Sequence, residues 1–309
     1  MTDHIIRVNG LKKNYGSTIA VDGIDFDIER GKLVSILGPN GAGKTTSLEC
    51  LEGLLKPDGG RIEIDGKSNT TDKKHLSNQI GIQLQSSALP ENLTVLEAMR
   101  LFCSYRRIPV RSDLLSRFGL NGKLNTRFSN LSTGQKRRLS LALAIIHNPQ
   151  VLFLDEPTAG LDVQSRIELH GIIGELKQGG TTIILATHDM AEAESLSDKI
   201  IILLNGKIVA EGSPAEITAT GDSVSRISVR TENRDISETL KLLPGIESFH
   251  LTDDFSVLFS RNIEETVSSV LELIKSSGDT LVDLRIERPT LEERFVEITD
   301  LNKQTTGVL

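Results

Sequence analysis

The sequence has little cysteine, few aromatic residues and no long hydrophobic run. It holds two cysteines, Cys50 and Cys103, and two tyrosines, and it has no tryptophan. Two cysteines provide neither a disulfide framework nor a zinc site, and Cys50 is expected in the core of a buried helix. No apolar stretch approaches the roughly 20 residues that cross a bilayer, and the segment MTDHIIRVNG lacks the basic and apolar regions of a signal peptide. We therefore expect a protein of the reducing cytosol.

The negative charge of the chain is concentrated toward its C-terminal end. The net charge is −7 over 309 residues, with 38% hydrophobic and 25% charged residues, as in ordinary globular proteins. Residues 1–220 hold 25 Lys and Arg against 25 Asp and Glu, whereas residues 221–309 hold 10 against 17. This distribution argues against nucleic acid or an anionic lipid surface as a binding partner.

Alternating strands and helices are predicted over residues 1–220. The segments VLFLD (151–155) and TTIILATH (181–188) are almost continuously apolar, as in central strands of a parallel sheet that is covered on both faces. Asn205-Gly206 between two apolar runs predicts a hairpin, and residues 90–147 have helical spacing. The predicted fold class is α/β, with a parallel core sheet, an antiparallel edge subdomain and an inserted helical subdomain.

A second domain is predicted after residue 220. Residues 213–225, SPAEITATGDSVS, lose periodicity and gather small polar residues, which indicates a boundary. The next segments are expected in the order strand, helix, two hairpin strands, helix and strand, which is the βαββαβ order of a ferredoxin-like α+β unit. A closing helix is expected at 290–298 and a frayed tail at 302–309. The predicted domains are thus 1–220 and 221–309, the second an accessory unit that regulates or supports a dimer.

A glycine-rich segment, GPNGAGKTT, lies between a predicted strand and a predicted helix. It matches the P-loop pattern G-x-x-x-x-G-K-[ST], in which backbone N–H groups surround phosphates, a lysine reaches the terminal phosphates and a hydroxyl coordinates Mg²⁺. Lys44 stands at the positive end of a helix dipole, where a bound phosphate would stabilise it. A chance match has odds of roughly one percent. The predicted nucleotide-binding residues are Gly38, Pro39, Asn40, Gly41, Ala42, Gly43, Lys44, Thr45 and Thr46.

A second segment also places cations at the start of a helix. In LSTGQKRRL, residues 131–139, a Ser-x-Gly pair precedes Lys136, Arg137 and Arg138. An anion arriving at this helix terminus would explain the arrangement. The alternative is an ordinary capped helix with a solvated basic first turn, and the segment by itself does not decide between the two.

Two carboxylates end the apolar strand in VLFLDE. Asp155 and Glu156 would be costly to bury there without a metal ion or an ordered water; the alternative is a solvated strand end. Asp155 can hold Mg²⁺ through its water shell, and Glu156 can polarise an attacking water, which contributes about 10²–10⁴ in rate. His188 ends the next apolar strand, where we expect a γ-phosphate contact rather than a purely structural histidine.

In this order, the segments resemble the ATP-binding subunit of an ABC transporter over nearly all of residues 4–220. The resemblance implies ATP and Mg²⁺ as ligands, with Tyr15 stacking on adenine unless it only packs. The signature motif usually reads LSGGQ, and Thr133 replaces its first glycine, which we expect to tune affinity rather than abolish function. The residues implied are Ser132, Gly134 and Gln135 in the signature motif; Glu156, His188, Lys44 and Gln85 as catalytic; Thr45, Gln85 and Asp155 as metal contacts; and residues 159–162 as the D-loop.

The resemblance also implies partners. In this family the signature motif of one subunit completes the P-loop site of a second, so a homodimer could hydrolyse ATP at two sites; a heterodimer with a paralogue stays open. A separate permease would be driven through a groove around Gln85 and the helical subdomain, which places the chain at the inner face of the cell membrane. Residues 288–299, RPTLEERFVEIT, resemble the ending of ATPases paired with exporters of drugs, antibiotics or lipids.

The competing class is a non-transport ABC ATPase that acts on DNA, the ribosome or iron–sulfur assembly. The chain lacks the long coiled coils of DNA-repair members, carries one ATPase cassette rather than two, and has an acidic appendage. A purely structural nucleotide binder conflicts with the presence of Glu156 and His188. We therefore expect ATP hydrolysis coupled to export, without a nucleic-acid partner, and the sequence does not reveal the transported substrate.

Overall fold

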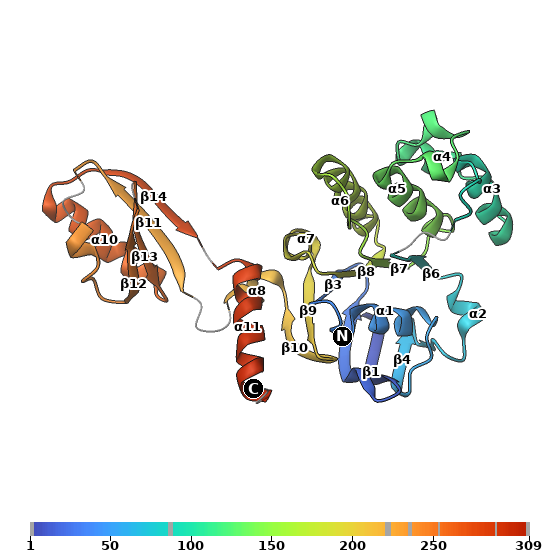
Figure 1. Ribbon diagram of the computed structural model, residues 1–309, viewed down its shortest axis with the longest axis horizontal. Helices are drawn as coiled ribbons and strands as arrows, with labels where there is room; N and C mark the ends of the chain where they lie inside the picture. The colour runs from blue at the N-terminus through green and yellow to red at the C-terminus, as the bar shows by residue number, and fades with distance from the viewer. Residues whose placement is uncertain are drawn as a thin grey trace. The chain divides into compact units, whose positions relative to one another are not determined.

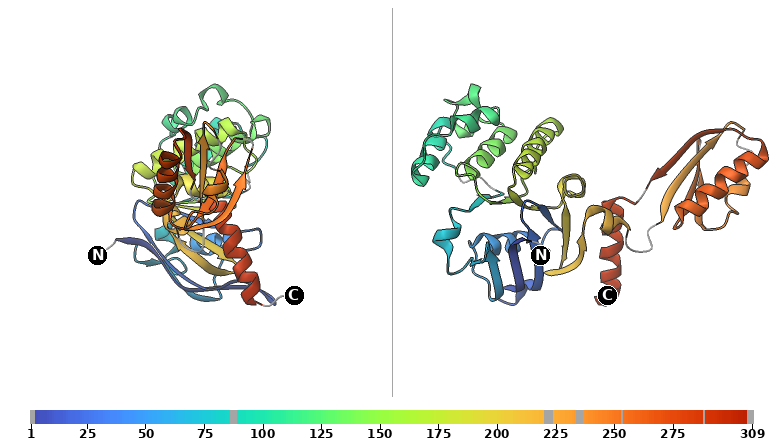
Figure 2. Two further views of the ribbon diagram at one scale, coloured as in Figure 1. Left: turned by 90° about the vertical axis from the view of Figure 1, so that its left-hand side faces the viewer. Right: turned by 180° about the vertical axis from the view of Figure 1, so that it is seen from behind.

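The computed structural model describes residues 3–85, 89–219, 224–233, 237–252, 254–287 and 289–306. The chain divides into two compact units, residues 1–214 and 215–309 (Figures 1 and 2). Among the described residues, no helix is both long and apolar enough to cross a bilayer. Residues 220–223 of the predicted boundary segment and Arg288 of the predicted export-type ending lie outside the described residues.

A six-stranded, mostly parallel sheet forms the centre of the first unit, in the order β10-β9-β3-β8-β7-β6. β10 runs antiparallel to β9, and the two are joined through Asn205 and Gly206, whose positive φ angles fit the predicted tight hairpin. β3, β7 and β8 are wholly buried, which confirms the central strands expected from their apolar runs. The strands are β3 (Leu33–Leu37), β6 (Ile80–Gln83), β7 (Val151–Asp155), β8 (Thr182–Thr187), β9 (Lys199–Leu204) and β10 (Lys207–Gly212).

The register of the parallel strands brings three loops to one edge of this sheet. Leu37 of β3 pairs with Thr187 of β8, and Asp155 of β7 pairs with Ala186 of β8. The segments that follow β3, β7 and β8 therefore leave the sheet side by side. This edge, at the carboxyl ends of the strands, is where open parallel sheets bind their ligands.

A second, antiparallel sheet in the order β2-β1-β4-β5 belongs to the same unit. One hydrophobic cluster joins its inward side chains to those of the parallel sheet and of helix α1, and Cys50 of α1 is fully buried there, as predicted. α1 ends at Gly53, which adopts the left-handed conformation typical of helix ends. The elements are β1 (His4–Tyr15), β2 (Thr18–Glu29), α1 (Lys44–Glu52), β4 (Gly59–Ile64), β5 (Lys67–Ser68) and α2 (Lys73–Leu76).

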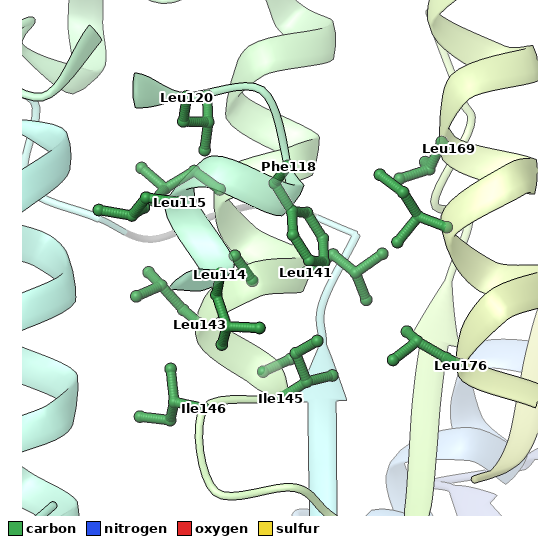
Figure 3. Close-up of a cluster of buried hydrophobic side chains, with 14 of the residues drawn as sticks. Leu114, Leu115, Phe118, Leu120, Leu141, Leu143, Ile145, Ile146, Leu169 and Leu176 are labelled. Atoms are coloured by element: carbon green, nitrogen blue, oxygen red, sulfur yellow. The ribbon is translucent and has the colours of Figure 1, made fainter. Parts of the chain in front are cut away.

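Between β6 and β7 the chain forms the predicted helical subdomain. Thr94 and Glu97 make a capping box that fixes the start of its first helix. Figure 3 shows leucine, isoleucine and phenylalanine side chains of α4, α5 and α6 meeting in one buried cluster, to which Phe118 contributes its ring. The elements here and after it are α3 (Val95–Arg106), α4 (Ser112–Arg117), the 3₁₀ turns Asn121–Lys123 and Phe128–Asn130, α5 (Thr133–Ala144), α6 (Val163–Gln178) and α7 (Met190–Leu196).

The second unit contains a four-stranded antiparallel sheet in the order β12-β13-β11-β14. Its elements follow one another as strand, helix, two strands, helix and strand, the sequence order predicted above. Buried Ile227, Val229 and Leu258 of the sheet pack with Val270 and Ile274 of α10. The elements are α8 (Pro214–Ala219), β11 (Ser225–Thr231), α9 (Ser237–Leu240), β12 (Ile246–Leu251), β13 (Ser256–Ser260), α10 (Ile263–Ser277), β14 (Leu281–Glu287) and α11 (Leu291–Thr306).

The last helix is longer than the sequence suggested. α11 continues from Leu291 to Thr306, so the expectation of a frayed tail was wrong for residues 302–306. The segment TDLNKQTT contains neither glycine nor proline, the residues that most often end a helix. Residues 307–309 of the predicted tail lie outside the described residues.

Candidate active site

The loop between β3 and α1 surrounds the side chain of Lys44. Lys44 is buried, and its Nζ donates hydrogen bonds to the carbonyl oxygens of Gly38 at 2.8 Å and Pro39 at 3.2 Å. Burial lowers the pKa of this ammonium, and the charges of Glu156 and Asp155 oppose that effect. A cation held this way needs a negative partner, which a triphosphate supplies.

The N-terminus of α1 is open to an anion. Gly43 is its N-cap residue, with φ of 101°, and it brings no side-chain acceptor to the first N–H groups of the helix. A Cβ atom at Gly43 would collide with the carbonyl oxygen of Ala20, and one at Gly38 would collide with that of Leu203. Glycine is therefore required at both positions, and the N–H donors of the first turn are left available to a phosphate.

A buried carboxylate lies beside this loop at the end of β7. Asp155 is 4% exposed, its side chain is hydrogen-bonded to Thr45, and its Oδ1 has no hydrogen-bond partner within the described chain. Burial and the neighbouring charge of Glu156 raise its pKa, against the effects of Thr45 and Lys44. A carboxylate and a hydroxyl in contact are oxygen ligands of the kind that Mg²⁺ prefers, so the donor set fits the predicted ion.

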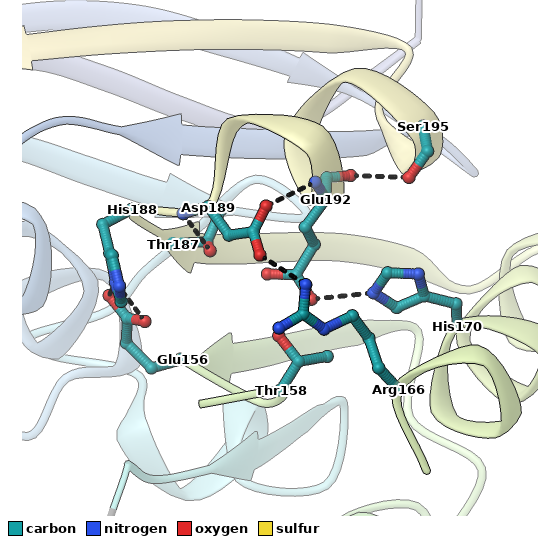
Figure 4. Close-up of polar contacts among 9 residues, drawn as sticks. All are labelled: Glu156, Thr158, Arg166, His170, Thr187, His188, Asp189, Glu192 and Ser195. Atoms are coloured by element: carbon teal, nitrogen blue, oxygen red, sulfur yellow. Dashed lines mark hydrogen bonds and ion pairs between the residues drawn. The ribbon is translucent and has the colours of Figure 1, made fainter. Parts of the chain in front are cut away.

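Glu156 follows Asp155 in a strained backbone conformation. Its φ angle is 48°, and its N–H donates to the carbonyl oxygen of Ala186 at 2.9 Å. Nδ1 of His188 lies 2.8 Å from one oxygen of the Glu156 carboxylate and 2.7 Å from the other (Figure 4). The Glu156 side chain is 9% exposed, whereas that of His188 is 59% exposed. A non-glycine residue held in this conformation, at a cost of about 1–3 kcal/mol, is typical of functional sites.

Beside this pair, a polar network centred on the buried Glu192 ties together the loops after β7 and β8. Glu192 of α7 accepts a hydrogen bond from the hydroxyl of Thr158 at 2.9 Å, and its carboxylate lies 3.1 Å from Nε2 of His170 (Figure 4). Asp189 caps α7 at the N–H of Glu192 and forms an ion pair with Arg166 of α6 at 2.9 Å. The network fixes the backbone segments that carry Glu156 and His188. Sequence analysis did not identify it.

The signature segment starts α5 with a side-chain cap. The hydroxyl of Ser132 accepts from the N–H of Gln135 at 3.2 Å, and the amide oxygen of Gln135 accepts from the N–H of Ser132 at 3.1 Å. Arg137 donates to the carbonyl oxygen of the exposed Gln85 at 2.5 Å. Burial lowers the pKa of Arg137, and the charges of Asp155 and Glu156 counteract this. Arg137 therefore links the segment after β6 to the signature helix, a role the sequence did not indicate.

The three cations at the start of α5 have partners within the chain. Besides the contact of Arg137, Nζ of Lys136 lies 5.2 Å from the centre of the Phe128 ring, and Arg138 forms an ion pair with Glu168 at 3.1 Å. These contacts agree with the alternative stated from the sequence, an ordinary capped helix with a basic first turn.

The structure brings part of the predicted site together. Lys44, Thr45, Asp155, Glu156 and His188 meet at the carboxyl edge of the parallel sheet. Tyr15, at the end of β1, is 50% exposed, with Nζ of Lys13 at 5.8 Å from its ring centre. Neither Tyr15 nor Ser132 has a contact with the edge residues among the interactions described above.

Comparison with known proteins identifies the family. A profile of the family described as ABC transporter matches residues 21–159. The daunorubicin resistance ATP-binding protein DrrA3 of Streptomyces coeruleorubidus is 37% identical over 308 residues, which cover 97% of each chain. This chain belongs to the ATP-binding subunits of ABC transporters. A Nod factor export ATP-binding protein I of Ralstonia nicotianae is 33% identical to this ABC ATPase, over 96% of this chain and 94% of its own length.

Solved structures agree with the assignment of this ABC ATPase. CbiO1 of Clostridium perfringens, part of the ABC transporter complex cbiONQ, superposes with a TM-score of 0.64 at 31% identity and covers 78% of this chain and 95% of its own. The ATP-binding cassette MJ0796, in a dimeric post-hydrolysis state with ADP and Pi, superposes with a TM-score of 0.61 at 28% identity, over 67% of this chain and 98% of its own. The predicted ABC ATPase fold and ATP hydrolysis are confirmed.

Proposed function

We propose that this ABC ATPase drives export of a substrate through a separate membrane permease, from the cytoplasmic face of the membrane. The relatives that match along its whole length are named for drug resistance and Nod factor export. These names favour transport over the alternative of a non-transport ATPase acting on nucleic acid, the ribosome or iron–sulfur assembly. The observation that carries ATP turnover is the contact of Glu156 with His188 beside Lys44 and Asp155.

The P-loop residues hold the phosphates of ATP. Backbone N–H groups of residues 40–46 would surround the β- and γ-phosphates, and Lys44 would exchange its backbone acceptors for the terminal phosphate oxygens. Thr45, Asp155 and Gln85 would hold Mg²⁺, which would neutralise charge on the phosphates. The unpaired Oδ1 of Asp155 is the oxygen left for that ion or for its water shell.

Glu156 orients the attacking water and accepts its proton. Its carboxylate is held by His188, whose exposed ring reaches the γ-phosphate through its other nitrogen, Nε2. Gln85 touches the same water and reports the position of the permease to the site, and its backbone is tied to α5 by Arg137. The strained backbone of Glu156 fixes the base before substrate binds, so no reorganisation is needed during the reaction.

A second copy of the chain completes each site. Ser132, Gly134 and Gln135 of one subunit face the P-loop of the other, and Tyr15 stacks on the adenine. The Ser132 cap presents these residues at a helix N-terminus, which favours the phosphates of the partner's ATP. The dimeric MJ0796 structure is consistent with this arrangement in a relative. Thr133 tunes the affinity of the signature motif.

The C-terminal region is a ferredoxin-like accessory domain. The strand order β12-β13-β11-β14 with antiparallel neighbours, together with the βαββαβ order along the chain, supports this proposal. We place residues 1–220 in the ATP-binding domain and residues 221–309 in the accessory domain. Its excess of acidic residues suits regulation or support of the dimer better than nucleic-acid binding.

Two measurements test the proposal. Glu156→Gln keeps an acceptor for His188 but removes the base, so ATP binding should persist while turnover falls at least about 100-fold. Glu194 is exposed, so Glu194→Gln is the matched control and should leave turnover unchanged. Near-normal turnover of Glu156→Gln would remove that residue from the role of base.

ATPase activity should also rise with permease-containing vesicles and not with DNA or RNA. Stimulation by nucleic acid alone would exclude the transport function.

A further inference from the structure

The start of α6 packs directly against the signature segment. A Cβ atom on Gly134 would lie 2.6 Å from Oγ of Ser165, so the glycine allows the first turns of α5 and α6 to touch. Asp162 caps α6 by accepting from the N–H of Ser165 at 2.8 Å and from its hydroxyl at 3.2 Å. Because so close a contact leaves no free space to absorb a displacement, a movement of the signature segment would also move α6.

Two contacts one turn apart join α6 to α7. Arg166 forms an ion pair with Asp189 at 2.9 Å, and Nε2 of His170 lies 3.1 Å from Oε1 of Glu192 (Figure 4). Arg166 and His170 are four residues apart, so they lie on the same face of α6. An ionised carboxylate only accepts hydrogen bonds, so Nε2 of His170 carries the proton. Two points of attachment fix the orientation of α7 relative to α6 as well as their separation.

Of these two contacts, the one made by Glu192 is the more buried. The Glu192 side chain is fully buried, whereas those of Arg166 and Asp189 are 41% and 25% exposed. Oε1 of Glu192 also accepts from Thr158 at 2.9 Å, and its Oε2 has no hydrogen-bond partner within the described chain. A buried carboxylate depends strongly on each donor that it has, because no water replaces a donor that is lost. The contact with His170 should therefore hold the two helices together more firmly than the exposed ion pair.

The backbone just before α7 carries the histidine that contacts Glu156. Asp189 follows His188 directly, and it caps α7 by accepting from the N–H of Glu192 at 3.0 Å. The N–H of Asp189 donates to Oγ1 of Thr187 at 3.0 Å. The backbone of His188 is thus held between the end of β8 and a capped helix, so a shift of α7 would change the position of the His188 ring.

We propose that His170 and Glu192 are positioning residues that couple the signature segment of a subunit to its own His188. The inference rests on the proposed function, in which Gly134 faces the ATP of the partner subunit and His188 faces the ATP of its own. Binding at the partner's site would hold the signature segment, α6 and α7 in one arrangement, and would thereby hold His188 against Glu156. The two ATP sites of the dimer would then turn over cooperatively.

The test replaces His170 by phenylalanine, which keeps a ring but loses the N–H donor to Glu192. The steady-state ATPase activity of the full-length subunit is measured against ATP concentration. We expect a Hill coefficient above one for the unmodified chain, with two as the ceiling for two sites, and a coefficient near one for His170→Phe. We also expect kcat of this variant to fall about tenfold, because one hydrogen bond to a buried carboxylate has been lost.

Two further variants separate positioning from stability. His170→Gln places an amide N–H near the lost donor, so it should restore the Hill coefficient and most of kcat. His75 is exposed, so His75→Phe makes the same substitution outside these contacts and should leave both quantities unchanged. Unfolding of each variant in urea, followed by circular dichroism, shows whether a loss of activity reflects only a loss of folded protein.

The outcomes separate this inference from the proposed function. An unchanged Hill coefficient in His170→Phe, whether or not kcat falls, would overturn the coupling and leave the proposed function intact. Failure of His170→Gln to restore the coefficient would make the contact purely structural, and a coefficient of one in the unmodified chain would exclude coupling altogether. The shared sites themselves are tested by analytical ultracentrifugation of Glu156→Gln with ATP, where a monomer would overturn both the proposed dimer and this inference.

Discussion

Replacing Glu52 by glutamine is expected to flatten the pH dependence of stability of the ATP-binding unit. Glu52, the last residue of α1, is 6% exposed, and neither of its carboxylate oxygens has a hydrogen-bond partner within the described chain. Burial is the main cause that raises the pKa of this carboxyl group from its ordinary value of 4.5 to about 8 in the folded protein. Between these pH values the native state holds a proton that the unfolded chain has lost, so stability falls as pH rises. The slope is up to about 1.4 kcal/mol per pH unit, or up to about 5 kcal/mol over the whole window. Above pH 8 the loss is complete.

Glu52→Gln cannot ionise, so it should match the unmodified chain near pH 4.5 and exceed its free energy of unfolding by a few kcal/mol above pH 8. Because the chain has no tryptophan, unfolding is best followed by far-UV circular dichroism in urea, at several pH values. The exposed Glu194→Gln serves as control and should keep the slope of the unmodified chain. Parallel pH profiles for Glu52→Gln and the unmodified chain would refute the view that Glu52 is buried without a counter-ion.

Two further predictions concern the nucleotide site. Thr158→Val removes the hydrogen-bond donor to the buried carboxylate of Glu192, so it should lower the free energy of unfolding by about 1–3 kcal/mol and change kcat for ATP more than KM. Thr158→Ser keeps the donor and should restore both quantities. An unchanged kcat in Thr158→Val would exclude a positioning role for Thr158. Gly43→Ala places a Cβ against the carbonyl oxygen of Ala20, at a residue whose φ angle is 101°. The substitution should abolish ATP binding, as measured by equilibrium dialysis. Retained affinity would contradict the strained loop geometry.

The sequence predicted those parts of the molecule that depend on local pattern. Apolar runs predicted β7 and β8, the Asn205-Gly206 pair predicted the hairpin, and the P-loop pattern placed Lys44 at the start of α1. Each of these features is determined by residues within about ten positions, where periodicity and turn chemistry are informative.

Contacts between distant segments could not be predicted in the same way. Thr158, His170 and Glu192 come from three different elements, and nothing in their spacing indicates that one carboxylate joins the other two. A cavity lined by Glu52, between the end of α1 and the helical subdomain, is similarly formed by segments almost 100 residues apart, up to His147. In both cases the side chains meet only once the sheet has been assembled, so their partners follow from topology rather than from sequence pattern.

The two ends of α1 differ in their surroundings: the glycine-rich loop precedes Lys44, and the buried Glu52 is the last residue of the helix. The helix has nine residues, about 13 Å at 1.5 Å per residue. Its flanking glycines, Gly43 and Gly53, both hold left-handed conformations. Residues with side chains rarely adopt this conformation, so the chain enters and leaves the helix at positions that favour glycine, and the length of α1 is defined at both ends.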